Sequence, residues 1–155
     1  MGYDIKTLKP SVDSKYRQGY FIPSHPEKYK GSLPIIYRSG LEKKIFSILD
    51  LSNSIVEWSS ESVKIQYWDP LKDKYRTYFP DVCFKDKDGE FYLGEIKPAS
   101  KLKRPVKGNK MKASTWKMIC EEYIINAEKI KAMKNLCSVN GYHAVIMDES
   151  FTWSG

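Results

Sequence analysis

The sequence predicts an α/β domain in which a mixed central β-sheet is flanked by helices and preceded by an irregular, basic N-terminal arm. An apolar stripe with helical spacing comes early, several short strand-like runs follow, and a long helical segment then leads to a last apolar run. Strands joined by tight turns pair antiparallel, whereas a strand reached through a crossover helix usually pairs in parallel. The order of elements therefore favours a mixed sheet with helices on its faces.

The arm covers residues 1–34 and is rich in proline and glycine. Lys15 and Arg17 lie among tyrosines there, and cations beside aromatic rings suit the phosphates and bases of a nucleic acid. The same composition fits a clamp on a protein partner, or a segment that wraps the surface of its own domain. We expect the folded domain to occupy residues 35–150.

A first helix is predicted from Gly40 to Asp50, because apolar residues recur there at helical spacing. Ser39 and Glu42 match the S-x-x-E capping box that marks a helix start. Glu42 therefore has two interpretations: it caps the helix, or it adds a carboxylate to a site beside the helix.

Four short strands are predicted next, at residues 55–58, 63–68, 75–84 and 90–97. Pro80 lies inside the third of these and removes a backbone donor, so we expect a bulge or a sheet edge there. The turn sequence Asp86-Lys87-Asp88-Gly89 should fold the third and fourth strands into a hairpin.

The rest of the chain is predicted to form a loop at 98–113, a helix at 114–136 and a closing strand at 142–147. From Lys101 to Lys117 the chain has seven Lys or Arg residues and no acid. Such a run is either a solvated surface or a contact with a polyanion, and we favour contact with DNA. The cations expected to bind it are Lys101, Lys103, Arg104, Lys107, Lys110 and Lys112, together with Lys15 and Arg17 of the arm.

The predicted hairpin would bring together two carboxylates and a lysine. Asp81 follows Pro80, while Glu95 and Lys97 share one face of the next strand because side chains alternate along a strand. Two carboxylates and an ammonium group at one point suit a hard divalent cation and an activated water. The alternative is an ordinary hairpin with a solvated, charged face.

Composition narrows the classes of partner. The net charge is +7 and the pI is about 9.2, which suits a polyanion. An anionic membrane would also suit this charge, but no apolar run approaches the ~20 residues of a spanning helix. The three cysteines are widely spaced and form no CxxC motif, so we expect buried, reduced thiols and no zinc site.

In the order of its parts the chain resembles the PD-(D/E)xK nuclease superfamily: a helix with a glutamate, a hairpin with D and ExK, a helix and a strand. Within that superfamily it is similar to the head completion nucleases of phages with contractile tails. The similarity covers roughly residues 15–147. The segments that carry it are Lys28-Tyr29-Lys30-Gly31, Ile36-Tyr37-Arg38-Ser39, Val56-Glu57-Trp58-Ser59-Ser60-Glu61, Tyr78-Phe79-Pro80-Asp81 and Gly94-Glu95-Ile96-Lys97-Pro98.

The resemblance implies a restriction-endonuclease-like fold and a catalytic set of Glu42, Asp81, Glu95 and Lys97. It implies that Mg²⁺, or Mn²⁺, is held by Asp81, Glu95, the backbone carbonyl of Ile96 and Glu42. Glu61 and Gln66 are weaker candidates for the same site.

The resemblance also implies an endonuclease that processes the end of packaged double-stranded DNA before the tail joins. Its partners would be DNA and phage head or neck proteins. It would act in the host cytoplasm during assembly, or remain in the virion. The alternative is a non-enzymatic head or neck protein that uses a nuclease fold to bind DNA or the portal region.

Overall fold

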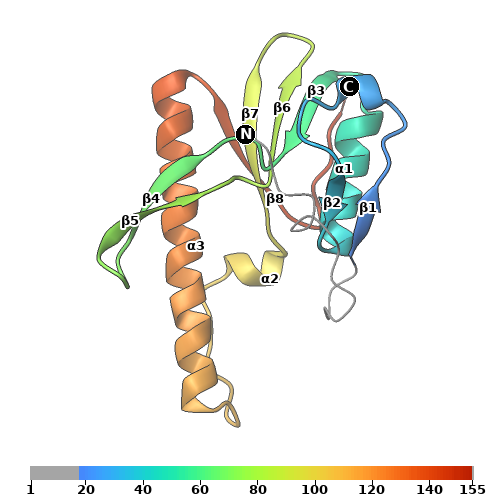
Figure 1. The fold of residues 1–155 in the computed structure, drawn as a ribbon. Helices are drawn as coiled ribbons and strands as arrows, with labels where there is room; N and C mark the ends of the chain where they lie inside the picture. The colour runs from blue at the N-terminus through green and yellow to red at the C-terminus, as the bar shows by residue number, and fades with distance from the viewer. Residues whose placement is uncertain (1–17, 155) are drawn as a thin grey trace.

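The computed structural model describes residues 18–154, and its central feature is a four-stranded sheet (Figure 1). In spatial order the strands are β3 (Ile55–Ser60), β6 (Val82–Asp86), β7 (Phe91–Ile96) and β8 (His143–Met147). The β3–β6 and β6–β7 pairs are antiparallel, and β7–β8 is parallel. The predicted mixed sheet is therefore confirmed.

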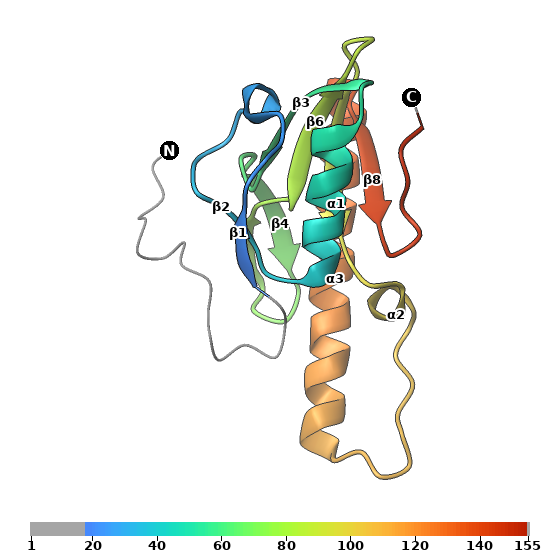
Figure 2. The same ribbon diagram turned by 90° about the vertical axis from the view of Figure 1, so that its right-hand side faces the viewer.

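One face of the sheet is covered by α1 (Gly40–Leu51), as Figure 2 shows. Ile45, Phe46 and Leu49 of α1 form one core cluster with sheet residues that include Trp58 and Phe84. The helix starts where the sequence predicted, since Ser39 Oγ accepts a hydrogen bond from the Glu42 backbone N–H at 3.1 Å.

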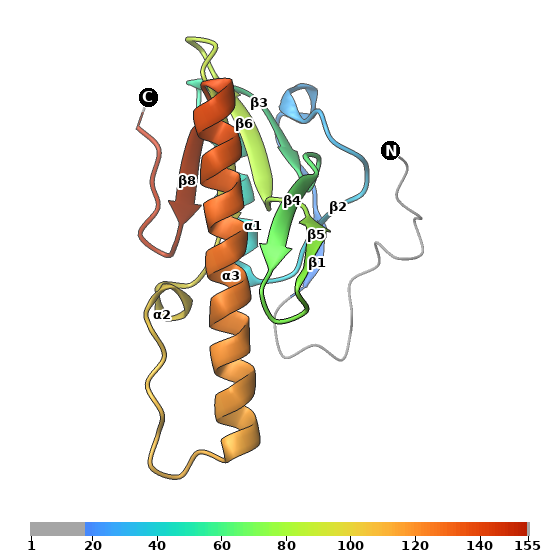
Figure 3. The same cartoon turned by 90° about the vertical axis from the view of Figure 1, so that its left-hand side faces the viewer.

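The other face is covered by α3 (Ala113–Asn140), which packs against β7, β8 and the hairpin of β4 (Ile65–Asp69) and β5 (Lys74–Tyr78) (Figure 3). Met133 and Cys137 of α3 pack with Leu93 of β7 in a second core cluster. The N-terminal half of α3 projects beyond the sheet, and residues 103–112 run beside it (Figure 1).

The prediction of a single strand at residues 75–84 is wrong, because Pro80 interrupts it completely. The first half is β5, which pairs with β4 in a separate two-stranded sheet, and the second half is β6 of the central sheet. A proline cannot donate to a ladder, so the chain leaves one sheet and enters the other at this residue. The turn after β6 forms as predicted, with Asp86 Oδ1 accepting from Asp88 N–H at 2.9 Å and Gly89 at a φ of +82°.

The predicted loop at 98–113 contains a short helix, α2 (Ala99–Leu102), and the last helix is longer than predicted at both ends. Its C-terminus lies at Gly141, whose φ of +71° is the left-handed conformation that ends many helices. Within residues 18–154, no helix combines the length and the apolar character that a membrane crossing requires.

Residues of the predicted arm that the structure describes are folded against the domain. β1 (Gly19–Phe21) pairs with β2 (Ile35–Tyr37), and the 3₁₀ turn η2 (Pro26–Lys28) lies between them in sequence. Lys28 Nζ donates to the carbonyls of Leu49, Asp50 and Ser52 at 2.7–2.8 Å, so this cation satisfies the end of α1. Lys15 and Arg17 lie outside the described residues, and the boundary at residue 34 stays a prediction.

Two leucines near the end of α1 test how far this core stabilises the fold. Leu49 is 0% exposed, whereas Leu51 is 58% exposed. Leu49→Ala should lower the free energy of unfolding by about 2–5 kcal/mol, because it leaves a cavity beneath the sheet. Leu51→Ala, measured in the same urea titration, should cost far less; equal losses would contradict the assigned core.

Candidate active site

Asp81, Glu95 and Lys97 lie together where β6 begins and β7 ends, on the face of the sheet that α3 covers. Side chains alternate along a strand, and Leu93 packs on the α3 side whereas Ile96 packs on the α1 side. Glu95 and Lys97 therefore point to the same side of the sheet as Leu93. Asp81 precedes β6 and likewise shares a side with Cys83 of the α3 cluster. The predicted fold-back of Asp81 onto Glu95 is present.

A hydrogen bond from the backbone holds Asp81 beside Glu95. Ile96 N–H donates to Asp81 Oδ2 at 2.7 Å. The β6–β7 register ends at the pair Val82 and Gly94, so this N–H lies one step beyond the backbone ladder and takes the carboxylate as its acceptor. The Asp81 carboxylate therefore satisfies an N–H beyond the end of the ladder, and this contact positions Asp81.

Glu95 is only 5% exposed. Lys97 Nζ lies 3.8 Å from Glu95 Oε1, the one ion pair of this carboxylate among the described residues. Its other oxygen, Oε2, is buried and has no hydrogen-bond partner within residues 18–154. An unpartnered buried carboxylate oxygen is costly unless a ligand completes it.

The electrostatics of the carboxylates follow from this crowding. Burial, together with the negative charge of Glu95, raises the pKa of Asp81 well above its ordinary value. Burial also raises the pKa of Glu95, although the Lys97 ammonium opposes the rise. Glu95 is buried and Asp81 is partly buried, so the two carboxylates repel each other beside a single lysine, and a cation between them would relieve that repulsion.

Glu42 approaches from the first turn of α1, at the opposite face of the sheet. Its Oε2 accepts from the Arg38 backbone N–H at 2.6 Å, so the carboxylate caps the helix start one residue earlier than a standard capping box. Burial, with Asp81 and Glu61 adding repulsion, raises the pKa of Glu42 to about 7. Because its charge is also coupled to that of Asp81, Glu42 can both cap the helix and act as a further carboxylate beside the site.

The two weaker candidates lie differently. Glu61 follows β3 in a left-handed conformation with φ of +51°, and its Oε1 forms an ion pair with Arg38 Nη1 at 2.8 Å. It also raises the pKa of both Asp81 and Glu42 through its charge. Gln66 is exposed on β4, on the hairpin face opposite to Tyr67.

The donor set fits a hard divalent cation. Within residues 18–154, no three His, Cys, Asp or Glu side chains are arranged as a ready-made metal cluster. Mg²⁺, however, usually keeps several waters and takes only one or two carboxylates from a protein. Asp81 and the unpartnered Oε2 of Glu95 supply two, and Glu42 is the further carboxylate that a water could join to them.

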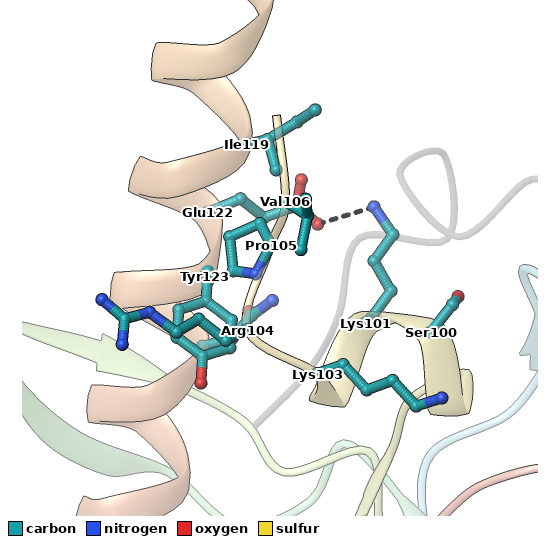
Figure 4. Close-up of a pocket in the computed structure, with 10 residues that line it drawn as sticks. Ser100, Lys101, Lys103, Arg104, Pro105, Val106, Ile119, Glu122 and Tyr123 are labelled. Atoms are coloured by element: carbon teal, nitrogen blue, oxygen red, sulfur yellow. Dashed lines mark hydrogen bonds and ion pairs between the residues drawn. The ribbon is translucent and has the colours of Figure 1, made fainter. Parts of the chain in front are cut away.

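The basic segment, residues 101–112, begins in α2 and continues beside the projecting half of α3 (Figure 4). Lys101 Nζ forms an ion pair with Glu122 at 3.2 Å, and a pocket of about 180 Å³ lies between this segment and Tyr123 of the helix. The other predicted cations of the segment are exposed: Lys103, Arg104, Lys107, Lys110 and Lys112.

One cation near the carboxylates could not be identified from the sequence. Lys129 lies on α3 and interacts electrostatically with Glu95 and Asp81. It belongs to no motif and is separated from the ExK strand by more than a loop and four helical turns, so only the packing of α3 on the sheet brings it here.

With this geometry in place, the chain can be compared with known proteins. A family model described as the TnsA-like endonuclease N-terminal domain matches residues 52–149, which include Asp81, Glu95 and Lys97. The chain belongs to the TnsA-like endonuclease family. The fold of this family is restriction-endonuclease-like, which confirms the predicted fold class.

A relative of this TnsA-like chain is the head completion nuclease of Enterobacteria phage T4. The two are 33% identical over 135 residues, which cover 84% of this chain and 90% of the relative. The predicted resemblance to head completion nucleases is thereby confirmed. No solved structure matches the chain.

The charged carboxylates of the site repel one another and so lower the stability of the fold. Removing one of these charges should therefore stabilise this TnsA-like domain when no metal is bound. A carboxyl group whose pKa is raised on folding contributes stability below its ordinary pKa, and loses it as pH rises through the folded value. Asp81→Asn keeps an oxygen for the Ile96 N–H and removes the charge. In EDTA its Tm should exceed the wild-type Tm at about pH 8, and the difference should shrink toward about pH 5.

Mg²⁺ should raise the Tm of the wild type and leave that of Asp81→Asn unchanged, because ligand binding stabilises only the state that binds. Asp88→Asn, in the exposed β6–β7 turn, is the matched control and should behave as wild type in both solutions. A lower Tm for Asp81→Asn at the higher pH, or an equal Mg²⁺ shift in both proteins, would contradict the site.

Proposed function

We propose that this chain is a metal-dependent DNA endonuclease that processes the end of packaged DNA during phage head completion. The observation that carries the proposal is the convergence of Asp81, Glu95 and Lys97 at one buried point of a TnsA-like fold. The named activity of the T4 relative supports a nuclease that acts in head completion.

The reaction is hydrolysis of a phosphodiester: a water oxygen loses a proton and bonds to phosphorus, and the bond from phosphorus to the leaving deoxyribose oxygen breaks as that oxygen gains a proton. Bound Mg²⁺ or Mn²⁺ would lower the pKa of a water and neutralise charge on the scissile phosphate. Asp81 and Glu95 would hold the cation through Oδ1 and Oε2, since the Ile96 N–H occupies Asp81 Oδ2 and Lys97 lies at Glu95 Oε1. The Ile96 carbonyl is the backbone ligand proposed with them.

Lys97 is the group of this chain best placed to handle the attacking water. Its ammonium lies beside Glu95 and is about three-quarters buried, with 27% of the side chain exposed. From there it orients the water, favours its ionised form through its positive charge and stabilises the additional negative charge on phosphorus. Glu42 would support the site from α1 by accepting a hydrogen bond from a water on the cation.

The assay that tests the proposal uses linear and supercoiled DNA with Mg²⁺. Glu95→Gln should lower the cleavage rate by at least 100-fold, roughly the loss seen when a group that stabilises the transition state is removed. Binding to DNA in EDTA should be retained, because the change removes a negative charge from a basic protein. Glu90→Gln, a matched change at an exposed position in the turn before β7, is the control and should cleave as wild type.

Two outcomes would contradict this function. Normal cleavage by Glu95→Gln would show that the activity uses another site. Absence of cleavage by the wild type under any metal condition, with DNA binding retained, would favour the non-enzymatic head or neck protein.

We propose that the exposed basic segment after α2 holds the flanking DNA. Changing Lys103, Arg104 and Lys107 together to Ala should weaken DNA binding and reduce the slope of log K against log salt by up to about 2.7, or 0.9 per phosphate contact. A triple variant of Lys87, Lys131 and Lys134 removes the same charge from exposed positions elsewhere and should change the slope less. Equal slopes for the two triple variants would mean that only net charge matters.

A further inference from the structure

The ammonium of Lys129 is held at a defined place over the α3 side of the sheet. Its Nζ lies 5.6 Å from the ring centroid of Tyr67 and 5.7 Å from that of Tyr78. The Tyr78 hydroxyl donates to the Lys129 backbone carbonyl at 2.7 Å, which ties this turn of α3 to the strand that leads to Asp81. Cation–π contacts of this kind hold a lysine without neutralising its charge.

Lys129 is surrounded by charged groups of both signs. Burial lowers its pKa, and the largest charge effect on it is repulsion from Lys97, ahead of the attraction of Glu95. The ion pairs within residues 18–154 include none for Lys129. A metal bound to Asp81 and Glu95 would cancel the attraction that remains, so this position favours an added anion.

Arg76 is a second cation that acts on Lys129. It pairs across the hairpin with Tyr67 and therefore projects from the same face, toward α3. Asp69 Oδ2 accepts from its Nη1 at 3.1 Å and fixes the guanidinium, and Arg76 in turn repels Lys129. Arg76, Lys129 and Lys97 thus form a row of cations contributed by β5, α3 and β7.

We propose that Lys129 binds a non-bridging phosphate oxygen of the DNA strand that enters this site, and that the row from Arg76 to Lys97 marks the path of that strand. The inference rests on the proposed nuclease function and deepens it. It makes Lys129 a positioning residue that places the scissile phosphate by holding a neighbouring one. The path crosses the inner face of the β4–β5 hairpin, which is a different surface from the basic segment after α2.

A phosphate is the anion that suits this row. The cations come from three separate elements, which matches the repeated charges of a nucleic-acid backbone better than a single carboxylate. A charge-assisted contact from an ammonium group to a phosphate also gains strength where the lysine is half-buried.

The test compares Lys129→Met, Lys129→Arg and Lys131→Met. Methionine keeps the apolar stem between the two tyrosine rings and removes the charge, arginine keeps the charge, and Lys131 is an exposed lysine two residues further on the same helix. Binding to a short fluorescein-labelled duplex is measured in EDTA, so that no strand is cut, from about 50 to 200 mM KCl. Thermal unfolding of each variant shows that it is folded.

Lys129→Met should reduce the slope of log K against log salt by about 0.9, the value for one lost phosphate contact. In single-turnover cleavage at saturating protein it should be slower by about tenfold to a hundredfold, as expected when a hydrogen bond to a charged group is lost. Lys129→Arg should keep the slope, and Lys131→Met should match wild type in both measurements.

Failure of this inference and failure of the nuclease function give different results. A wild type that cleaves, with Lys129→Met folded and equal to it in slope and rate, overturns the role of Lys129 alone. A loss of slope in Lys129→Arg as large as in Lys129→Met also overturns it, because the charge would not be what matters. If the wild type binds DNA without cutting it, the nuclease function fails and the slope measurement still decides whether Lys129 holds a phosphate.

Discussion

The hydrogen bond from Ile96 N–H to Asp81 Oδ2 is the contact on which the rest of this structure depends. It satisfies an N–H that lies beyond the β6–β7 ladder, at the point where the chain changes sheets between β5 and β6. Because β5 leaves, it pairs with β4 and builds the hairpin that packs on α3. The same bond places the first carboxylate against the second. The change of sheet at Pro80 is thus linked both to the carboxylate site and to the β4–β5 hairpin beside it.

The two faces of the sheet have separate tasks. The α1 side holds a dense apolar cluster around Trp58, Phe46 and Phe84, and Lys28 closes the end of the helix. The α3 side contains the carboxylates, Lys97 and Lys129, with charged groups buried beside apolar ones. Apolar packing on the α1 side offsets the repulsion between charges on the α3 side. This is expected where a functional site needs buried charges that lower the stability of the fold.

Much of this was predictable because the signals are local. The helix start at Ser39, the turn at Gly89 and the alternation of Glu95 and Lys97 depend only on nearby residues. The departure of β5 was not predictable, since a proline in a strand is compatible with a bulge, an edge or a break, and only the partner strand decides among them. Lys129 was hidden for a similar reason: its role depends on the angle at which α3 crosses the sheet, which helical periodicity does not determine.

Glu42 shows how a structural role and a chemical one can coincide. A glutamate at this turn is favoured for capping, and Glu42 does accept the Arg38 N–H. The same placement brings its carboxylate within the field of Asp81 and raises its pKa to about 7. Arg38 in turn forms an ion pair with Glu61, so the start of α1 and the end of β3 are fixed relative to the carboxylates. The helix cap therefore connects the position of α1 to the carboxylate site on the opposite face of the sheet.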